Sequence, residues 1–185
     1  SAGASPPLDE GERLMADTVR SFMEKEVLPR SDALETGSRE VLLELFSKAA
    51  AIGLTGLEVP ERYGGLGLSM KGAMLVTAEM ARQASFSTSI GAHFGIGTLP
   101  LAIFGSEALK GRYLPSLASG ERIGAYALTE PDAGSDALAV RTCATRAPGG
   151  DFVLDGRKQF ITNGSIAGLY TVFAKVDGEA FTAFL

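Results

Sequence analysis

The 185-residue sequence has few of the residues that build metal centres and disulfide frameworks. It contains one cysteine, Cys143, one histidine, His93, and no tryptophan. A single cysteine excludes an intrachain disulfide and is compatible with a reducing compartment. A lone histidine without a cysteine or clustered carboxylates beside it is not a metal site. We therefore interpret His93 as a residue of the core or of a pocket wall, and Cys143 as inert packing in a strand.

Positive charge and long apolar runs are also scarce. The chain has 17 Lys and Arg residues against 22 Asp and Glu, a formal net charge of -5, and no basic run. A nucleic-acid partner is thereby disfavoured, because phosphate binding needs a concentrated excess of Lys and Arg. No apolar run approaches the length that spans a membrane. The apolar fraction of 45% and the charged fraction of 21% are those of a globular protein.

The first two thirds of the chain predict helices. Asp9 and Glu12 resemble a capping box, apolar residues then recur at helical spacing, and Pro29 is expected to end this helix. The glycine-rich segment 57–67 predicts a loop. Further helices are expected over residues 38–53, 69–83, 87–98 and 107–114.

The pattern changes at Gly120, after which short apolar runs alternate with turn residues. Strands are expected over residues 123–128, 140–145, 152–154, 169–176 and 180–185. The last strand runs to the end of the chain without a turn, which would leave an unpaired edge, so we expect a longer protein rather than a frayed end. The prediction is an α+β fold, with a helical domain over residues 1–120 and an incomplete β domain over 121–185.

Two polar clusters follow predicted strands, about thirty residues apart. The first is Tyr126-Ala127-Leu128-Thr129-Glu130-Pro131-Asp132-Ala133-Gly134-Ser135-Asp136. Its small residues let a ligand reach backbone N–H groups, which suits a phosphate, and Thr129 offers a hydroxyl. The second is Lys158-Gln159-Phe160-Ile161-Thr162-Asn163-Gly164, where an aromatic residue precedes a hydroxyl and a tight-turn pair. Considered singly, the first cluster is equally compatible with a ligand site and with a polar turn, whereas the second is a weak signal that a structural turn also explains.

Together the two clusters resemble the acyl-CoA dehydrogenase family. Ala127 to Asp136 fits every position of the family's hallmark: small, aliphatic, Ser or Thr, Glu, two variable, small, Gly, Ser or Thr, Asp. Phe160 to Gly164 fits the second motif, an aromatic residue followed by Ile-Thr-Asn-Gly. The loop from Pro60 to Gly65 is similar to the family's amino-terminal domain. The resemblance covers residues 9–185.

The resemblance implies an amino-terminal helical domain, a middle antiparallel β-barrel domain and a carboxy-terminal four-helix domain that is absent from this chain. It implies an FAD-dependent oxidoreductase of fatty-acid β-oxidation that removes hydrogen from acyl-CoA thioesters. Electron-transfer flavoprotein is the implied acceptor, and a homodimer or homotetramer the implied assembly. The implied location is the bacterial cytoplasm or, alternatively, the mitochondrial matrix. A flavin monooxygenase or oxidase on the same fold, and a non-catalytic binding fragment, stay open as alternatives.

The resemblance also assigns the flavin contacts to particular residues. Leu128 and Thr129 would touch the isoalloxazine ring, and Thr129 would hydrogen-bond its pyrimidine side. Phe160, where many relatives carry Trp, would lie against the flavin face, and Thr162 near the reactive nitrogen. The implied cofactor-binding set is Tyr126, Ala127, Leu128, Thr129, Gly134, Ser135, Phe160, Ile161 and Thr162.

The remaining implied roles concern the substrate and the chemistry. Gly134 and Ser135 would approach the flavin pyrophosphate, and Ser135 would also meet the pantetheine of the substrate. The family's base is a Glu of the carboxy-terminal domain, so no catalytic residue is expected in this chain. Glu130 belongs to the flavin motif, where its role in the family is structural.

The helix expected over residues 87–98 bears on substrate length. In the family this helix lies at the closed end of the acyl pocket. Gly91, Gly95 and Gly97 are costly in a helix, and we expect their missing side chains to leave space for a long acyl chain. Close packing of helices is the alternative explanation. The Gly91-Ala92-His93 run is similar to the very-long-chain branch, so we expect acyl groups of about twelve carbons or more.

Overall fold

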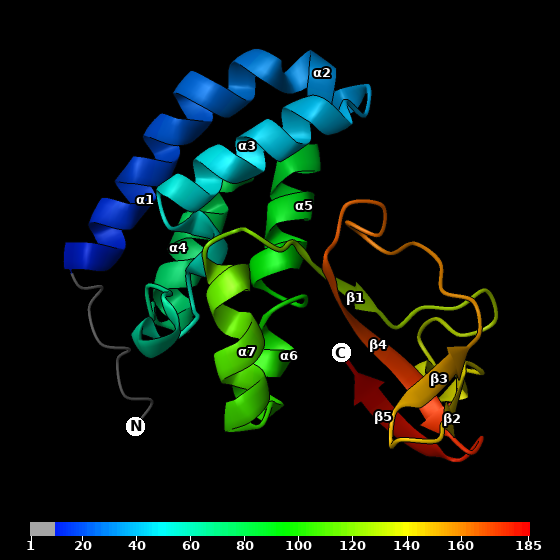
Figure 1. The fold of residues 1–185 in the computed structure, drawn as a ribbon. Helices are drawn as coiled ribbons and strands as arrows, with labels where there is room; N and C mark the ends of the chain where they lie inside the picture. The colour runs from blue at the N-terminus through cyan, green and yellow to red at the C-terminus, as the bar shows by residue number, and fades with distance from the viewer. Residues whose placement is uncertain (1–9) are drawn as a thin grey trace, which may run out of the picture.

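Helices form one side of the molecule and a small sheet the other (Figure 1). The computed structural model describes residues 10–185, so Asp9, the expected cap of the first helix, lies outside the described residues. The α-helices are α1 (Glu10–Phe22), α2 (Ser31–Glu35), α3 (Arg39–Ala51), α4 (Met70–Met80), α5 (Ala84–Phe94), α6 (Leu99–Phe104) and α7 (Glu107–Ala118). None of the helices among these residues is long and apolar enough to cross a membrane.

The first helical segment does not stop at Pro29, contrary to the expectation. The chain continues from α1 through a π-helical turn, Met23–Val27, and a 3₁₀ turn, Leu28–Arg30, into α2. Pro29 lies in the first residues of the 3₁₀ turn. At the start of a new turn the missing N–H of proline costs nothing, because that N–H would have no partner inside the turn.

Side-chain caps explain most of the remaining helix boundaries. Ser38 accepts a hydrogen bond from the N–H of Val41 at 3.4 Å, and Gly53 ends α3 with a φ of +80°, as expected for both. α5 begins three residues earlier than expected because the Gln83 side chain accepts from the N–H of Phe86 at 2.6 Å. The short helix α6, with Pro100 in its first turn, was not expected.

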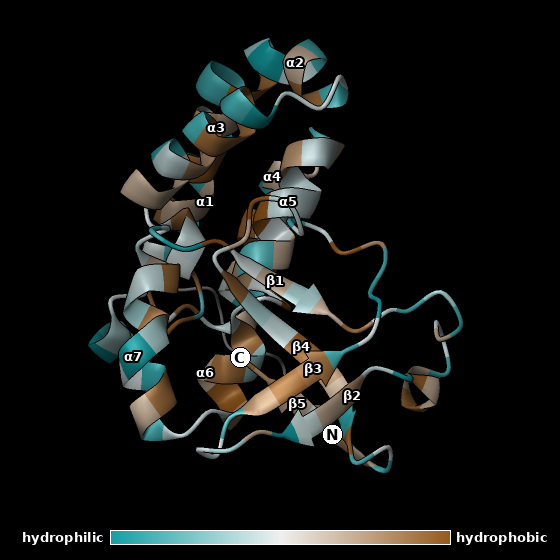
Figure 2. Ribbon diagram, turned by 45° about the vertical axis from the view of Figure 1, so that its right-hand side comes forward, coloured by the Kyte–Doolittle hydropathy of each residue, from teal (hydrophilic) through white to brown (hydrophobic). Residues whose placement is uncertain are grey.

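The helical part has a main buried apolar core, a smaller buried cluster around Leu101, Leu114 and Leu117, and one conspicuous apolar surface. Its fully buried side chains come from α1, α3, α4, α5 and the turns between them: Val19, Met23, Val27, Leu45, Leu54, Leu57, Val76, Met80, Phe86 and Ile90. α6, by contrast, is hydrophobic along nearly its whole length (Figure 2). Its Phe104 side chain is 84% exposed. Apolar side chains of α6 therefore remain exposed, unlike those of the helices that form the core.

The sheet contains β1 (Gly124–Ala127), β2 (Cys143–Arg146), β3 (Phe152–Asp155), β4 (Leu169–Val176) and β5 (Ala180–Phe184). Its order is β1-β4-β2-β3, with β5 also paired to β4. The α+β class and the order of helical and β parts are as expected. The expected antiparallel pairing holds for β2–β3 and β4–β5, whereas β1–β4 and β2–β4 are parallel. Parallel pairs cannot be joined by a hairpin, which is why long connections enter and leave this sheet.

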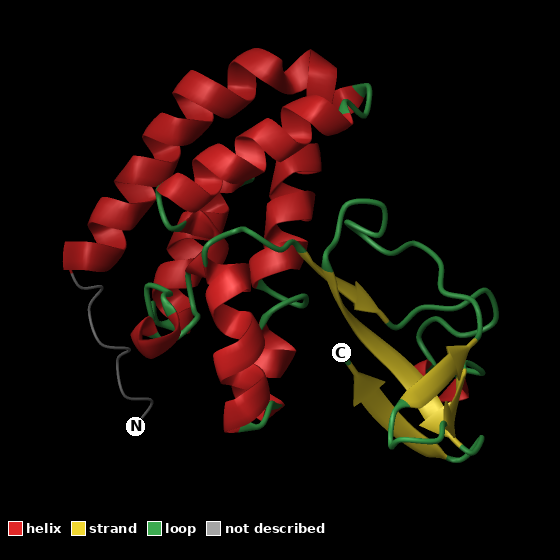
Figure 3. Cartoon of the chain, in the orientation of Figure 1, coloured by secondary structure: helices red, strands yellow, loops and turns green. Residues whose placement is uncertain are grey.

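Two of these connections carry the sequence motifs. Residues 128–142 run from β1 to β2, and residues 156–168 run from β3 to β4; both are irregular over most of their length (Figure 3). The two motifs were expected on neighbouring strands. The first begins in β1, as expected, whereas the second lies wholly in a loop. The two loops are nonetheless held together by hydrogen bonds between their backbones and side chains.

Candidate functional site

The two motif segments lie side by side, joined through Lys158 and Gln159. The N–H of Gln159 donates to the carbonyl of Thr129 at 3.0 Å, and its side-chain amide donates to the carbonyl of Glu130 at 3.2 Å. The Lys158 ammonium donates to the carbonyl of Leu128 at 3.0 Å and to the Glu130 carboxylate at 2.7 Å. Two clusters thirty residues apart in sequence thus form one structural unit.

Glu130 is the buried centre of this unit. Its carboxylate accepts from the backbone N–H groups of Arg141 at 2.6 Å and Thr142 at 3.0 Å, from the Thr142 hydroxyl, and from Lys158. Burial acts to raise the pKa of Glu130, but the N–H of Arg141, the Lys158 ammonium and the Thr142 donors outweigh it and lower the pKa to about 2. A carboxylate with so low a pKa is a poor proton acceptor. The structure therefore agrees with a structural role for Glu130 rather than a catalytic one.

A cavity of about 420 Å³ opens beside this unit. Ala127, Phe160 and Ile161, all among the expected cofactor residues, lie in its wall. The wall also contains Lys158, Gln159, Gly164, Tyr170 and Val172. No Asp, Glu, His or Cys is among these lining residues.

Phe160 is the most unusual residue of the site. Its side chain is 87% exposed, and its φ of +56° lies in the left-handed region, which bulky residues avoid. Strained backbone of this kind clusters at ligand-binding and active sites, which makes Phe160 a candidate ligand contact. Its ring stands at the wall of the cavity, where a flat ligand could stack on it.

Sequence reasoning missed the β4 residues of the site. Tyr170 and Val172 are two residues apart in β4, so their side chains point to the same face of the sheet. The Tyr170 hydroxyl donates to the carbonyl of Gly164 at 2.9 Å and so ties the second motif to the strand. The period of two along β4 was the available signal, but period alone does not say which face carries a site.

The other expected residues are not in the cavity wall. Leu128, Thr129 and Thr162 are half-buried beside it. Tyr126 lines a different cavity of about 640 Å³, formed by α6, the start of α7 and the face of the sheet that carries Thr171 and Phe173. Tyr126 and Ala127 are adjacent in β1 and so point to opposite faces. The side chain of Tyr126 is thus separated from the other expected cofactor residues.

Gly134 and Ser135 lie on an exposed turn. A Cβ atom added to Gly134 would meet no atom within 4 Å, so the space in front of its backbone is open. An open, side-chain-free backbone is what a phosphate needs in order to reach N–H groups. The position is compatible with the pyrophosphate contact implied for this turn.

His93 lies in the core, as interpreted from the sequence, and links three elements. Its Nδ1 accepts from the N–H of Gly124 at 2.9 Å, which places the proton on Nε2, 3.2 Å from the carbonyl of Leu117. Burial lowers the pKa of His93 to about 4, although hydrogen bonds to backbone carbonyls partly oppose this. The ring is therefore neutral at pH 7 and holds β1 between α5 and α7. The described residues contain no cluster that could hold a metal ion.

The glycines of the 91–97 segment only partly match the expectation of open space. A Cβ atom added to Gly95 would lie 2.7 Å from the carbonyl oxygen of Gly91, and one added to Gly97 would lie 2.8 Å from Ala92 and Gly124 backbone atoms. Both positions need glycine for close backbone approach, so packing explains them. Gly91 alone faces open space, with no atom within 4 Å of an added Cβ.

Comparison with known proteins shows which family has this arrangement. Residues 9–121 match the family model for the acyl-CoA dehydrogenase N-terminal domain, and residues 125–185 match the model for the middle domain. The chain belongs to the acyl-CoA dehydrogenase family. A solved acyl-CoA dehydrogenase complexed with FAD, from Bacillus anthracis, superposes with a TM-score of 0.92 at 43% identity and covers 96% of this chain and 30% of its own.

Curated members of the family give the range of similarity. A probable acyl-CoA dehydrogenase of Bacillus subtilis is 49% identical over 174 residues, which is 94% of this chain and 29% of the relative. A very long-chain specific enzyme of Macaca fascicularis is 39% identical over 164 residues, 88% of this chain and 24% of the relative. Isovaleryl-CoA dehydrogenase of Pongo abelii is 35% identical over 178 residues, 95% of this chain and 42% of the relative. The chain thus spans less than half of each relative, and these relatives act on unlike acyl groups according to their names.

Proposed function

We propose that the protein containing this chain is an FAD-dependent acyl-CoA dehydrogenase. The observation that carries the proposal is Phe160, an exposed aromatic ring on a strained backbone at the wall of a cavity that both family motifs build. The FAD-complexed Bacillus anthracis neighbour and the names of the curated relatives support it. We also propose the boundary between the helical and β domains near residue 120.

The residues of the site fit a flavin. Phe160, Ile161 and Val172 give the cavity wall aromatic and apolar surface that suits a flat ring system. Thr129 and Thr162 stand beside the cavity with hydroxyls that can meet the polar edge of such a ring. The open backbone at Gly134 suits a pyrophosphate. The set assigned to FAD is therefore the one expected from the sequence, with Tyr170 and Val172 added and with Tyr126 restricted to backbone contact.

FAD, when bound, supplies the acceptor for the hydride that leaves the β-carbon of an acyl thioester while a base takes the α-proton. The residues of this chain bind and orient the reactants, and the apolar wall excludes water. Glu130 is unsuitable as the base, because four donors already occupy its carboxylate. We therefore assign the base to none of the described residues.

A finer proposal concerns the acyl group. We propose a substrate acyl group of about twelve carbons or more, because each methylene buried in a pocket contributes roughly 0.8 kcal/mol. The support is the open space at Gly91 and the Gly91-Ala92-His93 run. Gly95 and Gly97 no longer contribute to this argument, since packing accounts for both.

The proposal includes the partners and location that the family resemblance implies. These are an acyl-CoA substrate, electron-transfer flavoprotein as acceptor, and assembly into a homodimer or homotetramer. A bacterial cytoplasmic location fits the Bacillus relatives best, with the mitochondrial matrix as the alternative.

The test is flavin binding followed by reduction with acyl-CoA. We expect the purified protein to bind FAD and its visible absorbance to bleach when acyl-CoA is added without oxygen. The Thr129→Val, Thr162→Val double change should weaken FAD binding about thirtyfold, at about 1 kcal/mol for each lost hydrogen bond. Thr145→Val, an exposed position on β2 outside both motifs, is the control and should change nothing.

The other results each point to a different function. Failure of the wild-type protein to bind FAD would refute the proposal. Bound flavin that acyl-CoA does not bleach, but that oxygen reoxidises rapidly after chemical reduction, would indicate an oxidase or monooxygenase. Bound flavin with neither reaction would indicate a binding protein. Retention of wild-type affinity by the double threonine variant would show that the motif residues are wrongly assigned.

A further inference from the structure

We propose that Lys158 is a positioning residue: its ammonium group fixes the separation of the two motif segments and thereby the place of the Phe160 ring. Calling the cavity a flavin site rests on the proposed function, whereas the positioning of Phe160 rests on this chain alone. Phe160 is 87% exposed, so its ring has almost no contacts of its own to hold it in place.

The backbone on both sides of Phe160 must therefore hold the ring in place. On the carboxy-terminal side, Gly164 donates its N–H to the Ile161 carbonyl at 2.9 Å and accepts from the Tyr170 hydroxyl at 2.9 Å. On the amino-terminal side, Lys158 and Gln159 make the hydrogen bonds to the neighbouring segment, residues 128–130. The left-handed backbone at Phe160 is strained, so it persists only while both sides are fixed.

Lys158 is the strongest of the amino-terminal ties. Its ammonium bridges two consecutive parts of the first motif, the Leu128 carbonyl at 3.0 Å and the Glu130 carboxylate at 2.7 Å. The side chains of Lys158 and Glu130 are 13% and 5% exposed, so water screens the pair little. The same side chain contributes to the cavity wall. One group therefore links the first motif, the second motif and the cavity.

The two halves of the pair are not equivalent. Glu130 keeps the N–H groups of Arg141 and Thr142 and the Thr142 hydroxyl if Lys158 is removed. Its carboxylate then stays hydrogen-bonded, and the β1–β2 connection stays closed around it. Loss of Lys158 should therefore release the 158–161 segment without unfolding the sheet. A buried pair that served stability alone would show no such local effect.

The absence of tryptophan makes the segment directly observable. In the 185-residue chain Phe160→Trp introduces the one indole, and its fluorescence anisotropy reports local motion with or without FAD. In that background Lys158→Met should lower the anisotropy and weaken FAD binding at least tenfold. Lys158→Arg, which keeps the charge and the donors, should restore most of both. Arg157→Met removes the same charge from the neighbouring exposed residue and should change neither.

Circular dichroism and thermal unfolding of each variant separate local release from unfolding. A folded Lys158→Met variant with unchanged anisotropy and unchanged FAD affinity would overturn the proposal. So would equal losses in Arg157→Met, or global unfolding of both Lys158→Met and Lys158→Gln, because Lys158 would then be a general stability element. If the wild-type protein binds no FAD, the proposed function fails, and the anisotropy without FAD still decides whether Lys158 positions residue 160. If the Phe160→Trp background alone loses FAD, the affinity is measured in the wild-type background.

Discussion

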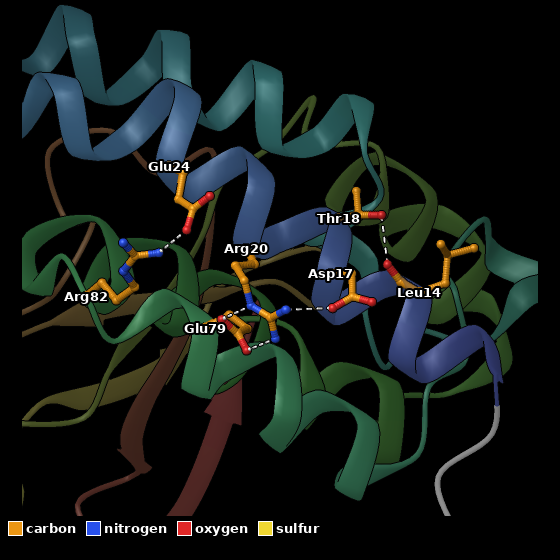
Figure 4. A network of polar contacts seen from close by, with 7 residues as sticks. All are labelled: Leu14, Asp17, Thr18, Arg20, Glu24, Glu79 and Arg82. Carbon is orange, nitrogen blue, oxygen red and sulfur yellow. Dashed lines mark hydrogen bonds and ion pairs between the residues drawn. The ribbon is translucent and has the colours of Figure 1, made fainter.

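The helical and β parts of this molecule differ in how deeply their ion pairs are buried. Arg20 of α1 contacts Glu79 of α4 at 2.7 Å and Asp17 of its own helix at 2.8 Å, and Arg82, just after α4, contacts Glu24 of the π-helical turn at 2.9 Å (Figure 4). The Arg20 side chain is 48% exposed. The β part has an exposed pair as well, Arg141 with Asp132 at 3.2 Å, but its second pair, Lys158 with Glu130, is almost entirely buried.

For stability, the burial of an ion pair matters more than the number of pairs. Exposed pairs gain little, because water competes for both partners and salt screens them. A buried pair is not needed for stability either, since apolar residues can often replace it, but it is costly to break by removing one partner. The helical part could therefore lose its pairs and remain folded, whereas the β part depends on one pair that lies between the two motifs.

The sharpest test of this comparison is Glu130→Ala. The change leaves the Lys158 ammonium without its carboxylate partner and removes the acceptor used by the Arg141 and Thr142 N–H groups. We expect a loss of about 3–5 kcal/mol in the free energy of unfolding, measured by urea denaturation. Thr145→Ala, on the exposed side of the same region, is the control. A loss below about 1 kcal/mol would show that the buried pair is no more important than the surface pairs.

His93 is a buried polar residue of the helical part. Its replacement tests whether this part, too, depends on a buried polar group. His93→Phe removes the acceptor of the Gly124 N–H, and an orphaned buried donor costs about 1–3 kcal/mol. The native pKa of about 4 lies below the ordinary value of 6.5, so the unfolded chain binds the proton first. Stability contributed by neutral His93 is therefore complete above pH 6.5 and is lost as the pH falls towards 4.

The measurement for His93 is urea denaturation across that pH range. The wild-type protein should lose stability between pH 6.5 and 4, and His93→Phe should flatten this part of the profile. Glu130 supplies an internal comparison at lower pH, because its contribution is lost only as the pH falls from 4.5 towards 2. An unchanged profile between pH 6.5 and 4 in His93→Phe would contradict the role given to the buried ring.

Local signals predicted the fold better than they predicted the site. The Ser38 cap, the αL glycine at Gly53 and the alternation along β4 act within a few residues, so the sequence alone displays them. The link between Glu130 and Lys158 spans 28 residues and depends on parallel pairing that local patterns do not encode. Gly95 and Gly97 were misread for the same reason: a missing side chain looks alike whether it leaves a pocket or admits a neighbouring backbone.

The smallest expected effect belongs to Arg20, and it tests the other side of the comparison. Arg20 is the strongest candidate among the exposed pairs, because its guanidinium reaches both Glu79 oxygens, at 2.7 and 3.0 Å, and joins α1 to α4. Even so, about half of its side chain is exposed, which limits the gain. We expect Arg20→Gln to lower the free energy of unfolding far less than Glu130→Ala does, measured by urea denaturation at low salt, and the difference from the wild type to shrink in about 1 M salt. A salt-independent loss as large as that of Glu130→Ala would mean that the surface network holds α1 against α4 as firmly as the buried pair holds the two motifs, and the comparison would fail.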